Sequence, residues 1–131
     1  MRVYLDTAPV IYLVEEVPNY AELVDRRVSV ADGIQVASDL TRMECRVKPL
    51  REGNTALLQD YDDYFAEVVE ETVVLSRAVI DRATDIRACY GFRTPDALHL
   101  AAAVVSGCDV FLTNDYRLNR FPDIAMDVIQ P

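Results

Sequence analysis

Short apolar runs alternate with amphipathic stretches along the whole chain. Compact groups of β-branched, aromatic and leucine residues predict strands at 3–5, 34–37, 72–75, 110–113 and 126–129. Between these groups, apolar residues recur at helical spacing, most clearly at Leu57, Leu58, Tyr61, Phe65 and Val68. Short, uniformly apolar strands that alternate with helices are typical of a parallel sheet covered on both faces. The pattern therefore predicts one α/β domain over residues 1–131, with a central parallel sheet of four to five strands.

The ends of the predicted helices follow from capping and helix-breaking residues. Ser38 or Asp39 caps a helix that Pro49 should stop, because proline lacks the amide proton that a helix interior requires. Thr94, followed by a proline, caps a later helix that closes at Gly107. These boundaries leave only short connections, so we expect no linker and no second domain.

Two aspartates follow predicted strands at positions that a parallel sheet brings together. Asp6 ends the first strand, and Asp115 lies two residues after Thr113, which ends the fourth. Ligands of open α/β sheets bind beyond the carboxyl ends of the strands. Glu44 and Asp96 lie on predicted helices. We expect these four carboxylates to form one acidic site.

Three of the four carboxylates also have a purely structural explanation. Asp6 is suited to cap a helix, and Asp115 is suited to the turn at residues 113–116. Asp96 lies in the first turn of its helix, where a carboxylate gains about 0.3–1 kcal/mol from the helix dipole. Each explanation is sufficient for one residue alone, so the hypothesis of a site rests on the four together.

Glu44 is harder to explain structurally. It shares a helix face with Leu40, Met43 and Val47, at three- and four-residue spacing. Burying a carboxylate costs free energy unless the carboxylate is paired or binds a metal. The alternative is a surface ion pair with Lys48, four residues later, which contributes only roughly 0.2–0.5 kcal/mol. We therefore favour a role for Glu44 in the site.

Carboxylates that converge at one sheet edge repel one another, and proteins retain such groups mainly to hold a cation. Ligand sets made only of oxygen favour Mg²⁺ or Mn²⁺ over zinc. One or two such ions suit hydrolysis of phosphodiester bonds, because a bound ion activates water for in-line attack. The polar neighbours placed to orient the carboxylates or the ion-bound water are Thr7, Thr94, Thr113 and Asn114.

Two other phosphate-handling classes on this type of fold suit the sequence less well. A receiver domain needs an acidic residue after the third strand, where Ser76 and Arg77 stand. A haloacid-dehalogenase-like phosphatase needs a second aspartate two residues after Asp6, where Ala8 stands. The sequence therefore favours a nuclease-type site over either.

Taken together, these residues resemble a PIN domain. The resemblance rests on the strand that ends at Asp6, the helical Glu44, the segment 94–103 around Asp96, and the segment 112–115. It covers nearly the whole chain, and the segment around Asp96 is its most specific part. The resemblance implies that Asp6, Glu44, Asp96 and Asp115 occupy the acidic positions of the family. It also implies that Asp6 and Asp96 contact metal most directly, with Asn114 as an alternative ligand to the more variable Asp115.

The size of the chain is similar to that of the VapC toxins of bacterial and archaeal toxin–antitoxin pairs. This resemblance implies a Mg²⁺- or Mn²⁺-dependent endoribonuclease that forms homodimers and is inhibited by a small cognate antitoxin. A housekeeping PIN-domain nuclease for RNA processing, or a PIN-like binding module without catalysis, is an alternative. The intact acidic set favours an enzyme.

The net charge of −9 argues against loose binding to polyanions, because phosphate contacts normally need a basic surface. Basic residues nevertheless flank the acidic positions, and three of them, Arg93, Arg117 and Arg120, lie near Asp96 or Asp115 in the sequence. We expect Arg93 to support the site or contact the substrate. The residues expected to bind RNA are Arg42, Arg46, Lys48 and Arg117.

The remaining features limit the interpretation further. His99 shares a helix face with Asp96, but its neighbours are small and apolar, so we expect a packed, hydrogen-bonded histidine. Tyr61, Tyr64 and Phe65 have helical spacing that favours the core or a dimer interface over base stacking. Three scattered cysteines fit neither a disulfide framework nor a zinc site. With no apolar run long enough to span a membrane and no signal peptide, we expect a cytoplasmic protein without an organic cofactor.

Overall fold

In the computed structural model, which describes residues 1–130, strand β1 (Arg2–Leu5) lies in the middle of a five-stranded sheet. The strand order is β3-β2-β1-β4-β5, and every neighbouring pair is parallel. The other strands are β2 (Ile34–Ser38), β3 (Glu71–Val73), β4 (Val110–Thr113) and β5 (Ala125–Val128). The predicted parallel α/β sheet is confirmed.

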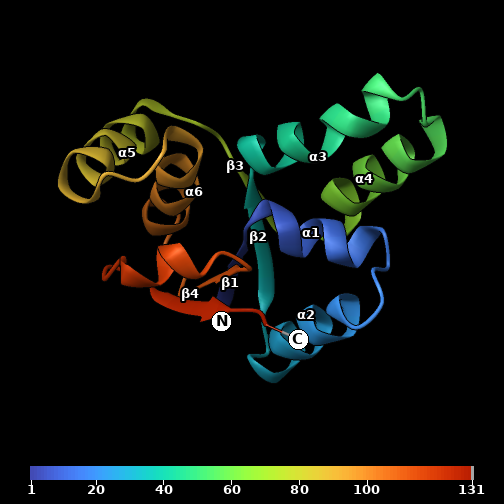
Figure 1. Cartoon of the computed structure of the whole chain (residues 1–131), viewed down its shortest axis with the longest axis horizontal. Helices are drawn as coiled ribbons and strands as arrows, with labels where there is room; N and C mark the ends of the chain where they lie inside the picture. The colour runs from blue at the N-terminus through green and yellow to red at the C-terminus, as the bar shows by residue number, and fades with distance from the viewer. Residues whose placement is uncertain (131) are drawn as a thin grey trace.

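Helices cover both faces of this sheet, as Figure 1 shows. One face packs against α5 (Arg77–Tyr90), α6 (Thr94–Val105) and the 3-10 helix η1 (Tyr116–Arg120). The opposite face packs against α1 (Thr7–Val14), α2 (Tyr20–Val30) and α4 (Thr55–Glu67). Helix α3 (Asp39–Arg51) follows β2 and contacts α1, α4 and α6. Because β2 leads directly into it, α3 begins at the carboxyl edge of the sheet.

The core lies in two layers because successive residues of a strand point to opposite faces. Tyr4 belongs to the layer under α5 and α6, where its ring stacks on Phe111 with centroids 5.2 Å apart. Leu5 belongs to the layer under α1, α2 and α4. Tyr61, Tyr64 and Phe65 are buried in that second layer, which confirms the expectation that they belong to the core. Asp6, which follows Leu5, is thereby fixed at the carboxyl edge of the sheet.

Several element ends differ from the sequence-based expectation, most of the strand ends by one or two residues. Helix α3 continues past Pro49 to Arg51, because a proline in the last turn costs one hydrogen bond and its ring is buried. Strand β3 ends at Val73 instead of residue 75, since a turn from Val74 begins there. Arg93, not Thr94, precedes α6 as its cap residue. By contrast, β4 spans the predicted residues 110–113.

Two further expectations concern the whole chain. Over residues 1–130, no helix is both long and apolar enough to cross a membrane. Cys45, Cys89 and Cys108 are all free, as their number and spacing predict.

Candidate active site

Asp6 is held at the carboxyl end of β1 by both of its carboxylate oxygens. Its backbone N–H donates to the carbonyl of Leu112, which continues the pairing of β1 with β4. Oδ1 accepts a hydrogen bond from the backbone N–H of Thr7 at 2.9 Å, so Asp6 caps α1. Oδ2 accepts one from the Thr113 hydroxyl at 2.8 Å. The carboxylate is therefore oriented by the ends of two neighbouring strands.

Glu44 is tied to the same edge by one carboxylate oxygen. Its Oε1 accepts hydrogen bonds from the Thr7 hydroxyl and from Nε2 of His99, both at 2.7 Å. Burial by itself pushes the pKa of Glu44 up, but the bonds from His99 and Thr7 outweigh burial and leave the pKa below its ordinary value. Glu44 is thus stabilised as a carboxylate.

The face of α3 that carries Glu44 differs from the predicted one. Met43 and Val47 are 56% and 48% exposed, whereas Cys45 is buried. The buried face of α3 thus includes Leu40 but not the other two members of the predicted stripe. Spacing alone therefore assigned the wrong stripe, because α3 packs against neighbouring helices through residues that include the small Cys45. Glu44 lies beside the buried face and contacts His99, which the sequence did not reveal.

His99 links Glu44 to a buried polar network. It is 2% exposed, and its Nδ1 lies 2.7 Å from the Tyr4 hydroxyl. That hydroxyl also bonds to Ser38, which caps α3, at 2.8 Å. The expectation of a packed, hydrogen-bonded histidine is confirmed. Tyr4 was missed at the sequence level, although a tyrosine within a buried strand requires a partner for its hydroxyl.

Asp96 and Asp115 form a second, more charged part of the site. Arg117 holds Asp115 through two side-chain hydrogen bonds of 3.0 and 2.7 Å, and these keep the pKa of Asp115 below its ordinary value. The pKa of Asp96 is raised, first by burial and then by the negative charges of Asp6 and Asp115, which Arg117 and Arg93 only partly offset. Asp96 therefore lies close enough to Asp6 and Asp115 to be affected by the negative charges of both.

The chemistry of these donors fits a hard divalent cation, although they are not assembled around one. Asp6, Asp96 and Asp115 offer only oxygen atoms, and the pKa of Asp96 is raised by burial and by the negative charges of the other two. Within residues 1–130, no group of three or more His, Cys, Asp or Glu side chains has the arrangement of a metal site.

Of the four polar residues expected to orient the carboxylates or the ion-bound water, two form hydrogen bonds with the carboxylates and two do not. Thr7 donates to Glu44, and Thr113 donates to Asp6. Thr94 instead accepts a hydrogen bond from Arg87 at 2.6 Å. Asn114 donates to the Tyr12 hydroxyl at 2.9 Å. The structure thus brings Thr7 and Thr113 to the carboxylates and directs the other two elsewhere.

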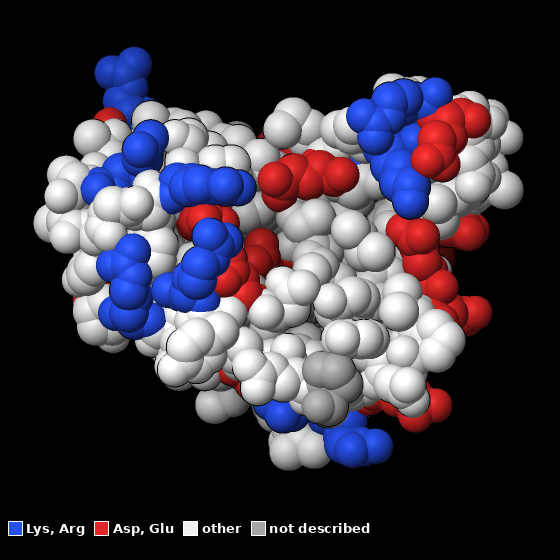
Figure 2. All heavy atoms as spheres, viewed as in Figure 1, with Lys and Arg blue, Asp and Glu red and all other residues white. Residues whose placement is uncertain are grey.

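Basic side chains flank the acidic hollow on two sides, as Figure 2 shows over the α3–α4 part and the α5–α6–η1 part. On α3, Arg42 and Arg46 both pair with Asp62, at 3.6 and 2.9 Å. Lys48 is exposed. On the other side, the Arg120 guanidinium lies 4.0 Å from the centre of the Phe92 ring. Positive charge on α3 is therefore partly neutralised within the chain.

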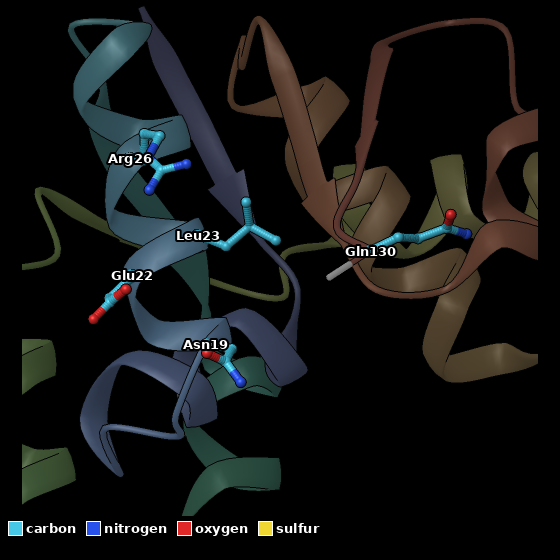
Figure 3. A pocket seen from close by; sticks show the side chains of 5 residues that line it. All are labelled: Asn19, Glu22, Leu23, Arg26 and Gln130. Carbon is cyan, nitrogen blue, oxygen red and sulfur yellow. The ribbon is translucent and has the colours of Figure 1, made fainter.

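A separate surface pocket of about 430 Å³ lies between α2 and the C-terminal segment. Figure 3 shows Asn19, Glu22, Leu23 and Arg26 on the α2 side and Gln130 across from them. None of the predicted site residues lines it. The pocket therefore provides no support for a second reactive centre.

Comparison with known proteins agrees with this fold. The PIN domain family model matches residues 3–124. A search of curated protein sequences found no match. Among solved structures, the chain is similar to one of the VapBC2 complex from Rickettsia felis bound to a promoter DNA fragment, with a TM-score of 0.79, 15% identity and 98% of each chain covered.

Two further solved structures have the same fold. A toxin–antitoxin complex from Klebsiella pneumoniae has a TM-score of 0.76 and 18% identity, and covers 94% of this chain and 95% of its own. The sarcin-ricin loop cleaving toxin VapC20 from Mycobacterium tuberculosis has a TM-score of 0.68 and 14% identity, and covers 94% and 98%. At these identities the likeness concerns the fold, whereas the family match spans most of the sequence. The chain therefore belongs to the PIN-domain family.

Proposed function

We propose that this chain is a metal-dependent endoribonuclease that hydrolyses phosphodiester bonds in RNA. The observation that carries the proposal is the gathering of carboxylates at the carboxyl edge of the sheet. Asp6 follows β1, Asp115 follows the neighbouring strand β4, and Asp96 is close enough to both for their charges to add to the effect of burial in raising its pKa. A bound dication is the ordinary means by which proteins compensate such charge. Membership of the PIN-domain family supports the same conclusion.

Each acidic residue has a distinct proposed role. Asp6 and Asp96 would be the principal ligands of one or two Mg²⁺ or Mn²⁺ ions, and Asp115 would complete the site. When bound, such an ion supplies an activated water and offsets the charge of the leaving oxygen. Glu44 is stabilised as a carboxylate through Oε1, while its Oε2 has no partner within residues 1–130 and is free to accept a hydrogen bond from the attacking water.

We further propose that the nuclease is the toxin of a VapBC-type pair, acting in the cytoplasm. Support comes from the similarity over nearly full length to chains of the Rickettsia felis and Klebsiella pneumoniae complexes. A small cognate antitoxin and a second copy of the chain would then be its protein partners. A housekeeping RNA-processing nuclease would use the same residues. Co-purification with the product of an adjacent small reading frame, together with loss of cleavage on adding that product, distinguishes the toxin.

The chemistry is tested by incubating the purified chain with structured RNA. We expect cleavage with Mg²⁺ or Mn²⁺, none with chelator, and a loss of roughly 10³-fold for Asp96→Asn. The control is Asp81→Asn, which removes an exposed aspartate from α5. Cleavage that persists in chelator, or that Asp96→Asn retains in full, would rule out the proposed chemistry.

A further inference from the structure

We propose that the rim formed by η1 and the α5–α6 loop binds one nucleotide of single-stranded RNA beside the cleaved phosphate. Tyr116 would stack on the base, and Arg120 would contact a phosphate. We call this surface the η1 rim, and its residues are Phe92, Arg93, Tyr116, Arg117 and Arg120. The inference rests on the proposed ribonuclease function and adds a path for the substrate.

The η1 rim contains a pocket adjacent to the acidic site. Its volume is about 360 Å³, and Tyr116, Arg117, Asn119 and Arg120 line it. This size is within the range of roughly 300–1,000 Å³ typical of small-ligand sites. Helix η1 begins immediately after Asp115, whose carboxylate accepts from the backbone N–H of Arg117 at 3.0 Å. A nucleotide in this pocket would therefore adjoin a phosphate held at the aspartates.

Tyr116 is placed as a stacking surface. It is 68% exposed, and it is the only exposed aromatic residue in the part of the chain that the structure describes. Every other tyrosine and phenylalanine there is at least partly buried. A base stacked on an aromatic ring contributes about 1–3 kcal/mol of binding and needs no particular sequence. The ring therefore has no role in the core and lies where a substrate base would pass.

Two of the three arginines of the η1 rim have no carboxylate partner within residues 1–130, whereas Arg117 pairs with Asp115. Phe92 is 4% exposed, and its ring supports the Arg120 guanidinium at 4.0 Å, which holds the charge in place. Within residues 1–130, neither Arg120 nor Arg93 forms an ion pair. A preorganised arginine without a carboxylate partner is suited to a phosphate.

The combination of features favours nucleic acid over an acidic peptide. An acidic peptide would need the arginines alone, whereas single-stranded nucleic acid uses an aromatic surface together with positive charge. On the opposite side of the site, Arg42 and Arg46 already share Asp62. Among the described residues, only the η1 rim combines an exposed aromatic ring with arginines that lack a carboxylate partner, so we expect the strand to bind most strongly there.

Binding can be measured without cleavage by fluorescence anisotropy. The parent protein carries Asp96→Asn and is kept in chelator, and the probe is a labelled single-stranded RNA of about 12 nucleotides. We expect Tyr116→Leu to raise the Kd about 5- to 10-fold and Tyr116→Phe to leave it unchanged. Arg120→Gln should reduce the slope of log K against log salt concentration by about one. Arg26→Ala, which removes a charge beside the α2 pocket, should do neither.

The outcomes separate this inference from the proposed function. If the wild-type chain cuts RNA but Tyr116→Leu binds as tightly as its parent, the η1 rim is not part of the RNA path. If Tyr116→Leu weakens an acidic peptide but not RNA, the surface serves a protein partner and the inference is overturned. If the wild-type chain neither binds nor cuts RNA, the proposed function fails and takes the inference with it. Thermal melting of each variant verifies that the fold is intact.

Discussion

The surroundings of Glu44 and of Asp96 shift the pKa values of these two carboxyl groups in opposite directions. On the Glu44 side, Thr7 and His99 donate to one oxygen and lower the pKa. On the Asp96 side, burial and two neighbouring aspartates raise the pKa, and no donor relieves Asp96 within residues 1–130. The fold therefore stabilises the charged form of Glu44 and disfavours the charged form of Asp96.

This difference distinguishes the part of the site that the chain itself stabilises from the part that a cation would stabilise. A carboxylate with two short hydrogen bonds is positioned before any ligand arrives, which suits a group that orients water or substrate. A carboxylate among like charges is stabilised by a bound cation. We therefore interpret the Glu44 side as the rigid part of the site and the Asp96 side as the part completed by metal.

The largest effect that separates the two sides is expected from Tyr4→Phe. The change removes the hydroxyl that contacts His99 and Ser38 inside the protein, but touches no carboxylate. With Nδ1 of His99 left unpaired, we expect a stability loss of about 1–3 kcal/mol and a fall in kcat of roughly 10- to 100-fold, measured by urea unfolding and RNA cleavage.

Tyr20→Phe is the matched control, because the Tyr20 hydroxyl lies on α2, outside this network. The binding of Mn²⁺, measured by calorimetry, should change little in Tyr4→Phe if the Glu44 side is separate from the metal ligands. A large loss of Mn²⁺ affinity would show instead that the two sides act as one unit.

A smaller effect is expected from neutralising one acid on each side in metal-free protein. Asp96→Asn removes a charge that two neighbours repel, so the free energy of unfolding should rise, by about 1 kcal/mol or less after solvent screening. Glu44→Gln removes the negative charge that two donors stabilise, so the free energy of unfolding should fall. Urea unfolding in chelator measures both changes, with Asp81→Asn as the surface control. Changes of the same sign would remove the distinction between the sides.

The smallest effect concerns the pH dependence of that stability. Glu44 has a lowered pKa in the folded protein, so its contribution is present above the unfolded pKa and is lost as pH falls through the folded one. Asp96 has a raised pKa, so its cost is present at high pH and is relieved as pH falls through that raised value. The quantity to compare is the free energy of unfolding of each variant minus that of the wild type. Between about pH 3 and 7, this difference should change with pH in opposite directions for Glu44→Gln and Asp96→Asn. If this difference changed with pH in the same direction for both variants, the opposite pKa shifts of Glu44 and Asp96 would be contradicted.

Much of the fold and part of the site follow from local pattern. The apolar run at residues 110–113 predicts β4 correctly. The pairing of β4 with β1 places Asp6 and Asp115 at the carboxyl edge of the sheet. Such features depend on periodicity and on the general rule for parallel sheets. They need no knowledge of which side chains meet.

The remaining features depend on contacts between distant segments. His99 meets Tyr4 across 95 residues and Glu44 across 55, and nothing in their spacing encodes those rotamers. Met43 looked like core because apolar residues at helical spacing do not reveal which stripe a neighbour covers. Asn114 looked like a ligand because its bond to Tyr12 depends on how α1 packs. Tertiary packing decided each of these points.

The middle position of β1 also determines when the site becomes complete during synthesis on the ribosome. Asp6 is made early, but Thr113, which donates to its carboxylate, follows 107 residues later. β1 likewise gains β4 as a neighbour only after α6 has been made. A nascent chain that has not yet reached β4 therefore lacks the half of the sheet that orients Asp6. Under the proposed nuclease function, this order of synthesis would prevent cleavage of RNA until β4 has paired with β1.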